Sequence, residues 1–124
     1  MVKFYKCNTC GNIVYKLVDK NIPVFCCGKP MTELKANSVD AAVEKHVPAL
    51  SYSDGKLDVV VGDVLHPATV EHHIDFILVE TKDGILVKHL DPLEAPKASF
   101  LVNKEDVVCV YAYCNLHGLW KNEL

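Results

Sequence analysis

Four cysteines near the start of the chain stand at a spacing that suits a single metal ion. Cys7 and Cys10 form a Cys-x-x-Cys pair, and Cys26 and Cys27 are directly adjacent. Four thiolates can surround zinc or a single iron tetrahedrally, and the spacing alone leaves both metals open. Adjacent cysteines distort the tetrahedron, which is unusual in a purely structural zinc ribbon. The four residues therefore predict a metal site, with a zinc ribbon as the structural alternative.

A second group of possible ligands combines histidines with one cysteine. Cys114 and His117 form a Cys-x-x-His pair, and His46, His66 and His72 lie in predicted loops or at the ends of predicted elements. Rigid scaffolds commonly present functional groups at such positions. A blue-copper site also uses histidines and one cysteine, but both methionines of this chain lie far from the pair, so an axial methionine ligand is missing. Copper is therefore only a minor alternative.

Two further histidines and one further cysteine are predicted not to be ligands. A strand beginning at His72 would carry that residue on the same face as Ile74, Phe76 and Leu78. This alternation puts His73 on the opposite face, and we interpret His73 and His89 as surface residues. Cys109 lies in a predicted strand, where a buried free thiol behaves as a small apolar side chain.

The composition is that of an ordinary globular chain. Its 124 residues are 50% apolar and 23% charged, with a formal net charge of −3. All thirteen basic residues are scattered lysines, so the basic patch of a nucleic-acid-binding protein is not predicted. No run approaches the roughly 20 apolar residues of a membrane span or has the form of a signal peptide. We expect a cytoplasmic protein, in which cysteines more often bind metals than form disulfides.

The elements that must position these ligands divide into two domains, residues 1–36 and residues 37–124. Strands are predicted at Val2–Lys6 and Ile13–Val18 in the first domain, which is too small for a core of its own and needs a metal as a staple. A helix is predicted from Ser38 to about Glu44, with Ser38 as its N-cap.

From residue 49 onward the pattern predicts strands. The dipeptides Asp54-Gly55 and Asp83-Gly84 are strong hairpin signals. The predicted strands are Ala49–Ser53, Lys56–Val61, His72–Thr81, Ile85–Leu90, Ser99–Val102 and Val107–Tyr113. Six or more short strands without a long helix predict an antiparallel β-sandwich.

Taken together, the motifs resemble desulfoferrodoxin, the two-iron form of superoxide reductase. The matching segments are Cys7-x-x-Cys10 with Cys26-Cys27, Glu44-Lys45-His46-Val47-Pro48, His66-Pro67 with His72, and Cys114-Asn115-Leu116-His117-Gly118-Leu119-Trp120. They cover essentially the entire chain in the family's order. The resemblance implies a mainly β fold, in which a desulforedoxin-like metal knuckle, residues 1–36, precedes an immunoglobulin-like, neelaredoxin-like β-sandwich, residues 37–124.

The resemblance also implies two mononuclear irons and an activity. One iron is an Fe(Cys)4 centre held by Cys7, Cys10, Cys26 and Cys27. The other is an Fe(His)4(Cys) centre, with a plane of imidazoles from His46, His66, His72 and His117, the axial thiolate of Cys114 and an open sixth position. The implied reaction is the one-electron reduction of superoxide to hydrogen peroxide, with electrons from a rubredoxin-like donor, in a homodimer that detoxifies superoxide under oxidative stress.

The resemblance assigns catalytic roles to Glu44 and Lys45. Lys45 would attract the superoxide anion and orient water for protonation, and Glu44 would bind the oxidised iron when substrate is absent. Two other functions stay open. One is a non-catalytic electron-transfer iron protein, and the other is a structural zinc protein.

Overall fold

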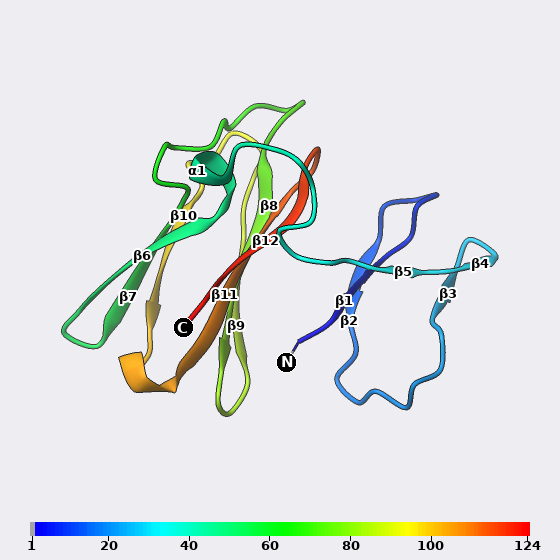
Figure 1. Ribbon diagram of the computed structural model, residues 1–124, viewed down its shortest axis with the longest axis horizontal. Helices are drawn as coiled ribbons and strands as arrows, with labels where there is room; N and C mark the ends of the chain where they lie inside the picture. Colours follow the sequence, from blue (N-terminus) through cyan, green and yellow to red (C-terminus); the bar gives the residue numbers. More distant parts are fainter. Residues whose placement is uncertain (1) are drawn as a thin grey trace. The chain divides into compact units, whose positions relative to one another are not determined.

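The computed structural model describes residues 2–124, which form two compact units, one ending at Lys35 and the other spanning Ala36–Leu124. This division lies one residue before the predicted domain boundary. Both units are built mainly of β-strands (Figure 1), which confirms the predicted fold class. Within residues 2–124, no helix has the length and apolar character needed to cross a membrane.

The first unit is a small set of short strands with very little core. Strands β1 (Phe4–Lys6), β2 (Ile13–Tyr15) and β5 (Thr32–Glu33) form one antiparallel sheet, and β3 (Phe25–Cys26) pairs with β4 (Lys29–Pro30). The predicted strand Ile13–Val18 is too long, because the chain turns after Tyr15. Lys16 Nζ holds this turn by donating hydrogen bonds to the carbonyl oxygen of Ile22 at 2.8 Å and to Asp19 Oδ1 at 3.2 Å.

The second unit is a sandwich of two antiparallel sheets with an immunoglobulin-like arrangement (Figure 1). One sheet has the order β10-β7-β6, from Lys97–Leu101, Lys56–Val61 and Pro48–Ser53. The other has the order β12-β11-β8-β9, from Gly118–Glu123, Val107–Cys114, Ile74–Thr81 and Ile85–His89. A 3-10 helix, η1 (Lys104–Asp106), leads into β11.

The predicted hairpin at Asp54-Gly55 is confirmed. Strands β6 and β7 pair from Pro48 with Val61 to Ser53 with Lys56, which leaves these two residues as the turn. Their φ angles are 51° and 76°, as a type I′ turn requires at both central positions.

Strand β12 was not predicted from the sequence. Its segment ends in Lys121-Asn122-Glu123, and asparagine and glutamate have low strand propensity. The strand exists because β11 supplies a pairing edge along its whole length, from Cys114 opposite Gly118 to Cys109 opposite Glu123.

The predicted helix at Ser38–Glu44 is wrong. The only α-helix in the described chain is α1 (Val43–His46), and its N-cap residue Ala42 makes no side-chain cap hydrogen bond. The segment before it is held against β12. The Asn37 backbone N–H donates to the carbonyl oxygen of Leu119 at 3.0 Å, and Asn37 Oδ1 accepts the N–H of Lys121 at 2.9 Å. Pairing with a strand thus overrides the local helix propensity.

Strand β8 does not follow the simple alternation expected from His72. The register shifts between Tyr113 opposite Phe76 and Cys114 opposite Ile74, which leaves Asp75 as an extra residue. As a result Ile74 lies in the core together with Ile77 and Val79, whereas Phe76 and Leu78 lie outside the core cluster. The predicted face shared by Ile74, Phe76 and Leu78 is therefore wrong.

The core between the two sheets accounts for most of the stability of the second unit. We expect Ile77→Ala, at a fully buried site, to lower the free energy of unfolding by about 2–5 kcal/mol, because it removes buried methyl groups and leaves a cavity. The control Leu101→Ala, at a side chain that is 85% exposed, should change it by no more than about 0.5 kcal/mol. Urea unfolding followed by the fluorescence of the single tryptophan, Trp120, measures both; equal effects would contradict the assigned core.

Candidate metal centres

The four N-terminal cysteines come together in the first unit. Their sulfurs lie within 4.8 Å of one another, with Cys10 Sγ 3.6 Å from Cys26 Sγ and Cys26 Sγ 4.0 Å from Cys27 Sγ. Four sulfurs at about 2.3 Å from a tetrahedral ion would lie about 3.8 Å apart. The cluster therefore has the dimensions of a four-thiolate metal site.

The backbone around this cluster donates hydrogen bonds to sulfur. The N–H of Cys10 points to Cys7 Sγ at 3.4 Å, and the N–H of Asn12 points to Cys10 Sγ at 3.4 Å. These tight turns use positive φ angles at Gly11, Cys27 and Gly28, of 86°, 53° and 75°. The amides face the positions where thiolate charge would lie.

The thiols interact strongly enough to shift one another's proton affinity. The backbone amides of Cys10 and Thr9 lower the pKa of Cys7 to about 6, whereas the neighbouring thiols of Cys10 and Cys7 raise the pKa of Cys27 to about 12. Without a cation the cluster would retain protons at neutral pH. A bound cation favours all four thiolates together, because it stabilises their negative charge.

The second cluster is assembled from a helix end, one loop, a strand end and one turn. His46 is the last residue of α1, His66 and His72 lie in the connection from β7 to β8, Cys114 ends β11, and His117 immediately precedes β12. Ligand atoms of His46, His72, Cys114 and His117 lie within 4.8 Å of one another, and the ring of His66 contacts those of His46 and His72. The structure thus brings all five predicted donors together.

The four imidazoles are spaced like the corners of a square. Neighbouring ring centroids are 4.8 Å apart for His46–His66, 4.5 Å for His66–His72, 5.1 Å for His72–His117 and 5.0 Å for His46–His117. The measured diagonal, His46–His72, is longer at 6.3 Å. Cys114 Sγ lies 3.9 Å from His117 Nδ1.

Hydrogen bonds to backbone carbonyls select the nitrogens that face the centre. The Nδ1 atoms of His46 and His66 lie 2.6 Å from the oxygen of Ala42 and 2.8 Å from the oxygen of Pro67, which assigns the proton to Nδ1 and the lone pair to Nε2. His117 instead presents Nδ1, which is 3.2 Å from His46 Nε2.

The nitrogens of this cluster are placed as ligands of a cation would be. His66 Nε2 and His72 Nε2 are buried and have no hydrogen-bond partner within residues 2–124, a costly state for a polar atom. Two nitrogens bound at right angles at about 2.1 Å from one ion lie about 3.0 Å apart, close to the separation of His46 Nε2 and His117 Nδ1. The donor set therefore fits a metal ion with four imidazole ligands and one thiolate ligand.

Burial keeps the imidazoles in the form that binds metals. Desolvation lowers the pKa of His66 to about 4 and also lowers the pKa values of His46 and His72. These rings are therefore neutral at pH 7. Desolvation raises the pKa of the fully buried Cys114 thiol, so a metal ion would have to displace its proton on binding.

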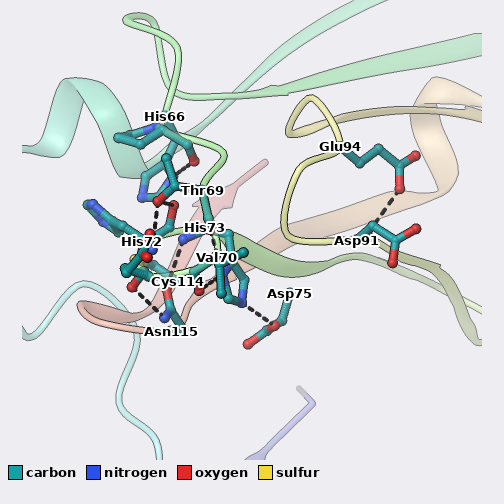
Figure 2. A network of polar contacts seen from close by, with 12 residues as sticks. His66, Thr69, Val70, His72, His73, Asp75, Asp91, Glu94, Cys114 and Asn115 are labelled. Carbon is teal, nitrogen blue, oxygen red and sulfur yellow. Dashed lines mark hydrogen bonds and ion pairs between the residues drawn. The ribbon is translucent and has the colours of Figure 1, made fainter.

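Asn115 fastens the loop that carries His72 to the turn that carries Cys114 and His117 (Figure 2). Its Oδ1 accepts the backbone N–H of His73 at 2.8 Å, and its Nδ2 donates to the oxygen of Glu71 at 3.0 Å. The ring of His73 in turn lies 3.0 Å from Asp75 Oδ1. We call Asn115, His73 and Asp75 the ligand clamp.

The structure corrects one of the three predictions about residues that are not ligands and confirms the other two. His73 is not a surface residue, since its side chain is only 12% exposed and makes hydrogen bonds at both ring nitrogens. His89 is exposed, as predicted. Cys109 is buried and free, also as predicted.

Trp120 supports two ligands and was given no role in the sequence analysis. Its ring stacks on His46 with centroids 4.9 Å apart, and its Nε1–H donates to the oxygen of His117 at 3.0 Å. The sequence signal that could have indicated this role is the position of Trp120, three residues after the predicted ligand His117. Glu44 and Lys45, the two predicted catalytic residues, precede His46 on α1 and are both exposed.

Comparison with known proteins assigns the family. A sequence model of desulfoferrodoxin matches residues 38–123. The desulfoferrodoxin of Desulfarculus baarsii is 42% identical over 122 residues, which are 98% of this chain and 96% of that protein. The chain belongs to the desulfoferrodoxin family. The donor sets of this chain accordingly fit two iron sites, one with four cysteines and one with four histidines and a cysteine.

Two solved structures resemble this chain to different extents. The superoxide reductase of Treponema pallidum is 31% identical, with a TM-score of 0.82, and the match covers 99% of this chain and 99% of that chain. The one-iron superoxide reductase of Giardia intestinalis is 39% identical, with a TM-score of 0.54, and the match covers 65% of this chain and 99% of that chain. About a third of this chain is therefore additional to the one-iron protein.

The two clusters should load metal independently, because each has its own complete donor set. We expect Cys114→Ser to lose the second metal while the absorption of the four-cysteine site persists. Cys7→Ser should lose the first metal and retain the second. Metal analysis with visible spectra of both purified variants measures this. Loss of both metals in either variant would contradict two independent sites.

Proposed function

We propose that this chain is a superoxide reductase, which joins superoxide with one electron and two protons to form hydrogen peroxide. The observation that carries this proposal is the square of four imidazoles, of which those of His46 and His66 are buried, together with one buried thiolate. Five donors around one ion leave one octahedral position open, and an open position distinguishes a reactive metal from a structural one. Iron bound there supplies a one-electron couple and a binding position for a small anion.

Lys45 supplies the positive charge that guides the substrate. It is exposed and directly precedes the ligand His46, so its ammonium group is presented beside the second cluster. A cation there raises the local concentration of superoxide and stabilises negative charge that develops on oxygen. Glu44 precedes it on α1 and would offer its carboxylate as a ligand to an oxidised metal in the absence of substrate.

The environment of Cys114 adjusts the electron density that its thiolate donates. Its sulfur is buried and accepts the backbone N–H of His117 at 3.4 Å. Hydrogen bonds to a ligand sulfur, together with its burial, tune the reduction potential of the metal. Cys114 and His117 are linked by this contact as well as by sequence.

Electrons reach the protein from a small rubredoxin-like donor in this proposal. Four exposed aliphatic side chains support a docking surface beside the second cluster, since each lies within three residues of a proposed ligand. They are Val43, Leu65, Val70 and Leu116, with exposed fractions of 58%, 57%, 64% and 59%. The exposed Cys10 and Cys27 support electron exchange through the first site as well.

The remaining features of the proposal concern assembly and location. We propose a homodimer because the first unit exposes apolar side chains that a second copy would cover. These are Leu17, Val18, Ile22 and Phe25. A cytoplasmic role in superoxide detoxification agrees with six cysteines that are all free.

The stoichiometry of the reaction tests the proposed activity. When the fully reduced holoprotein is mixed with superoxide, we expect one hydrogen peroxide per superoxide consumed and oxidation of the second centre. Dismutation would yield half as much peroxide, with dioxygen as the other product. No acceleration over spontaneous decay would favour the alternative function, a non-catalytic electron-transfer iron protein.

Lys45→Ala should slow the second-order reaction with superoxide by about tenfold, because it removes the steering cation. The dependence of this rate on ionic strength should also weaken. Pulse radiolysis at several salt concentrations measures both quantities. Lys104→Ala is the matched control, since it removes an exposed lysine from η1. An unchanged rate in Lys45→Ala would remove this residue from the mechanism.

A further inference from the structure

Gly62, directly after β7, leaves no room for a side chain. Its φ angle is +83°, which only glycine adopts readily. A Cβ atom there would lie 2.6 Å from the Cα of Lys45 and 2.5 Å from its carbonyl carbon, and closer still to the carbonyl oxygen of Glu44. All three atoms belong to backbone, so the conflict could be relieved only by moving the segment that carries Glu44 and Lys45.

A hydrogen bond holds the same two segments together. The backbone N–H of Val64 donates to the carbonyl oxygen of Glu44 at 2.8 Å. This bond joins the loop Gly62–Val64 to the part of α1 that carries the two predicted catalytic residues, Glu44 and Lys45. We call this loop the α1 seat. Close approach at Gly62 and the hydrogen bond at Val64 act on the same part of the helix.

Helix α1 cannot fix its own position. It has four residues and no side-chain cap at its N-terminus, and a single helical turn is unstable in isolation. One end is tied down by His46, whose Nδ1 lies 2.6 Å from the oxygen of Ala42 and whose ring stacks on Trp120. Within residues 2–124, the exposed side chains of Glu44 and Lys45 have no comparable anchor, so the position of their backbone depends on the α1 seat.

We propose that Gly62 is a positioning residue for Lys45. By lacking a side chain it lets the α1 seat lie against the backbone of Glu44 and Lys45, and so fixes where the ammonium group stands relative to the open side of the second cluster. The inference rests on the proposed function, because it gives Gly62 a role only through the substrate-guiding cation.

A double-mutant cycle tests this with iron-loaded full-length protein. Gly62→Ala should slow the reaction with superoxide several-fold and weaken its salt dependence, as Lys45→Ala does, while iron content and both visible bands are retained. The double variant should be no slower than Lys45→Ala alone, since Gly62 acts through that lysine. Gly55→Ala is the matched control: its φ is +76°, but nothing lies within 4 Å of the added Cβ. It should react at the parent rate.

Three outcomes would overturn the inference. Independent rate losses that multiply in the double variant would mean that Gly62 acts by another route. Loss of the second iron in Gly62→Ala would mean that the loop serves His66, whose N–H donates to the oxygen of Val61 at 3.0 Å. An equal loss of rate in Gly55→Ala would mean that the slower reaction of Gly62→Ala results only from backbone strain at a positive φ angle.

A measurement on the unaltered protein decides the case in which Gly62→Ala does not fold. The Val64 amide should exchange with deuterium at least roughly 100-fold more slowly than an unstructured amide, because it is bonded within the α1 seat. Unprotected exchange would overturn the inference. If instead Lys45→Ala reacts at the parent rate while Val64 is protected, the proposed role of the lysine fails and the α1 seat stands as a structural contact only.

Discussion

Buried donor atoms that no protein group can satisfy are the constraint on which the second unit depends. In the part of the chain that the structure describes, His66 Nε2 and His72 Nε2 are buried without a hydrogen-bond partner, and His46 Nε2 lies 3.2 Å from His117 Nδ1. Each unsatisfied buried polar group costs about 1–3 kcal/mol. The fold can hold these atoms together only if its other contacts are strong enough, or if a metal ion binds them. Metal binding and folding stability are therefore linked in this unit.

The sandwich meets that constraint by bringing ligands from distant parts of the chain to one end of a rigid core. β11 pairs on both edges, and Cys114 stands at its end. The segments that carry the histidines contain little helix or strand, so polar contacts hold them in position instead of backbone pairing. Backbone carbonyls orient the rings of His46 and His66, the ligand clamp fixes the His72 loop, and Trp120 braces His46 and His117.

The sequence predicted those features that depend on residue type and local spacing. The cysteine and histidine motifs named the donors that the structure gathers into two clusters, and Asp54-Gly55 predicted its hairpin because a type I′ turn is a local property. Features that depend on distant pairing were missed. The helix at Ser38–Glu44 failed because Asn37 binds β12, more than eighty residues away. The alternation in β8 failed because a bulge at Asp75 arises only when β8 pairs with β11.

The two clusters differ in the solvent exposure of their ligands. The first has two exposed thiols and lies in a unit with little core, which suits the exchange of electrons at a surface. In the second, desolvation lowers the pKa values of His46, His66 and His72 and so keeps these three imidazoles neutral, which means that they do not attract an anion by charge. The positive charge that the proposed function assigns to Lys45 has to lie outside the buried cluster and yet close to it. An exposed lysine one residue before a buried ligand meets both conditions, and the α1 seat can hold it there because contacts between backbone atoms leave the lysine side chain in water.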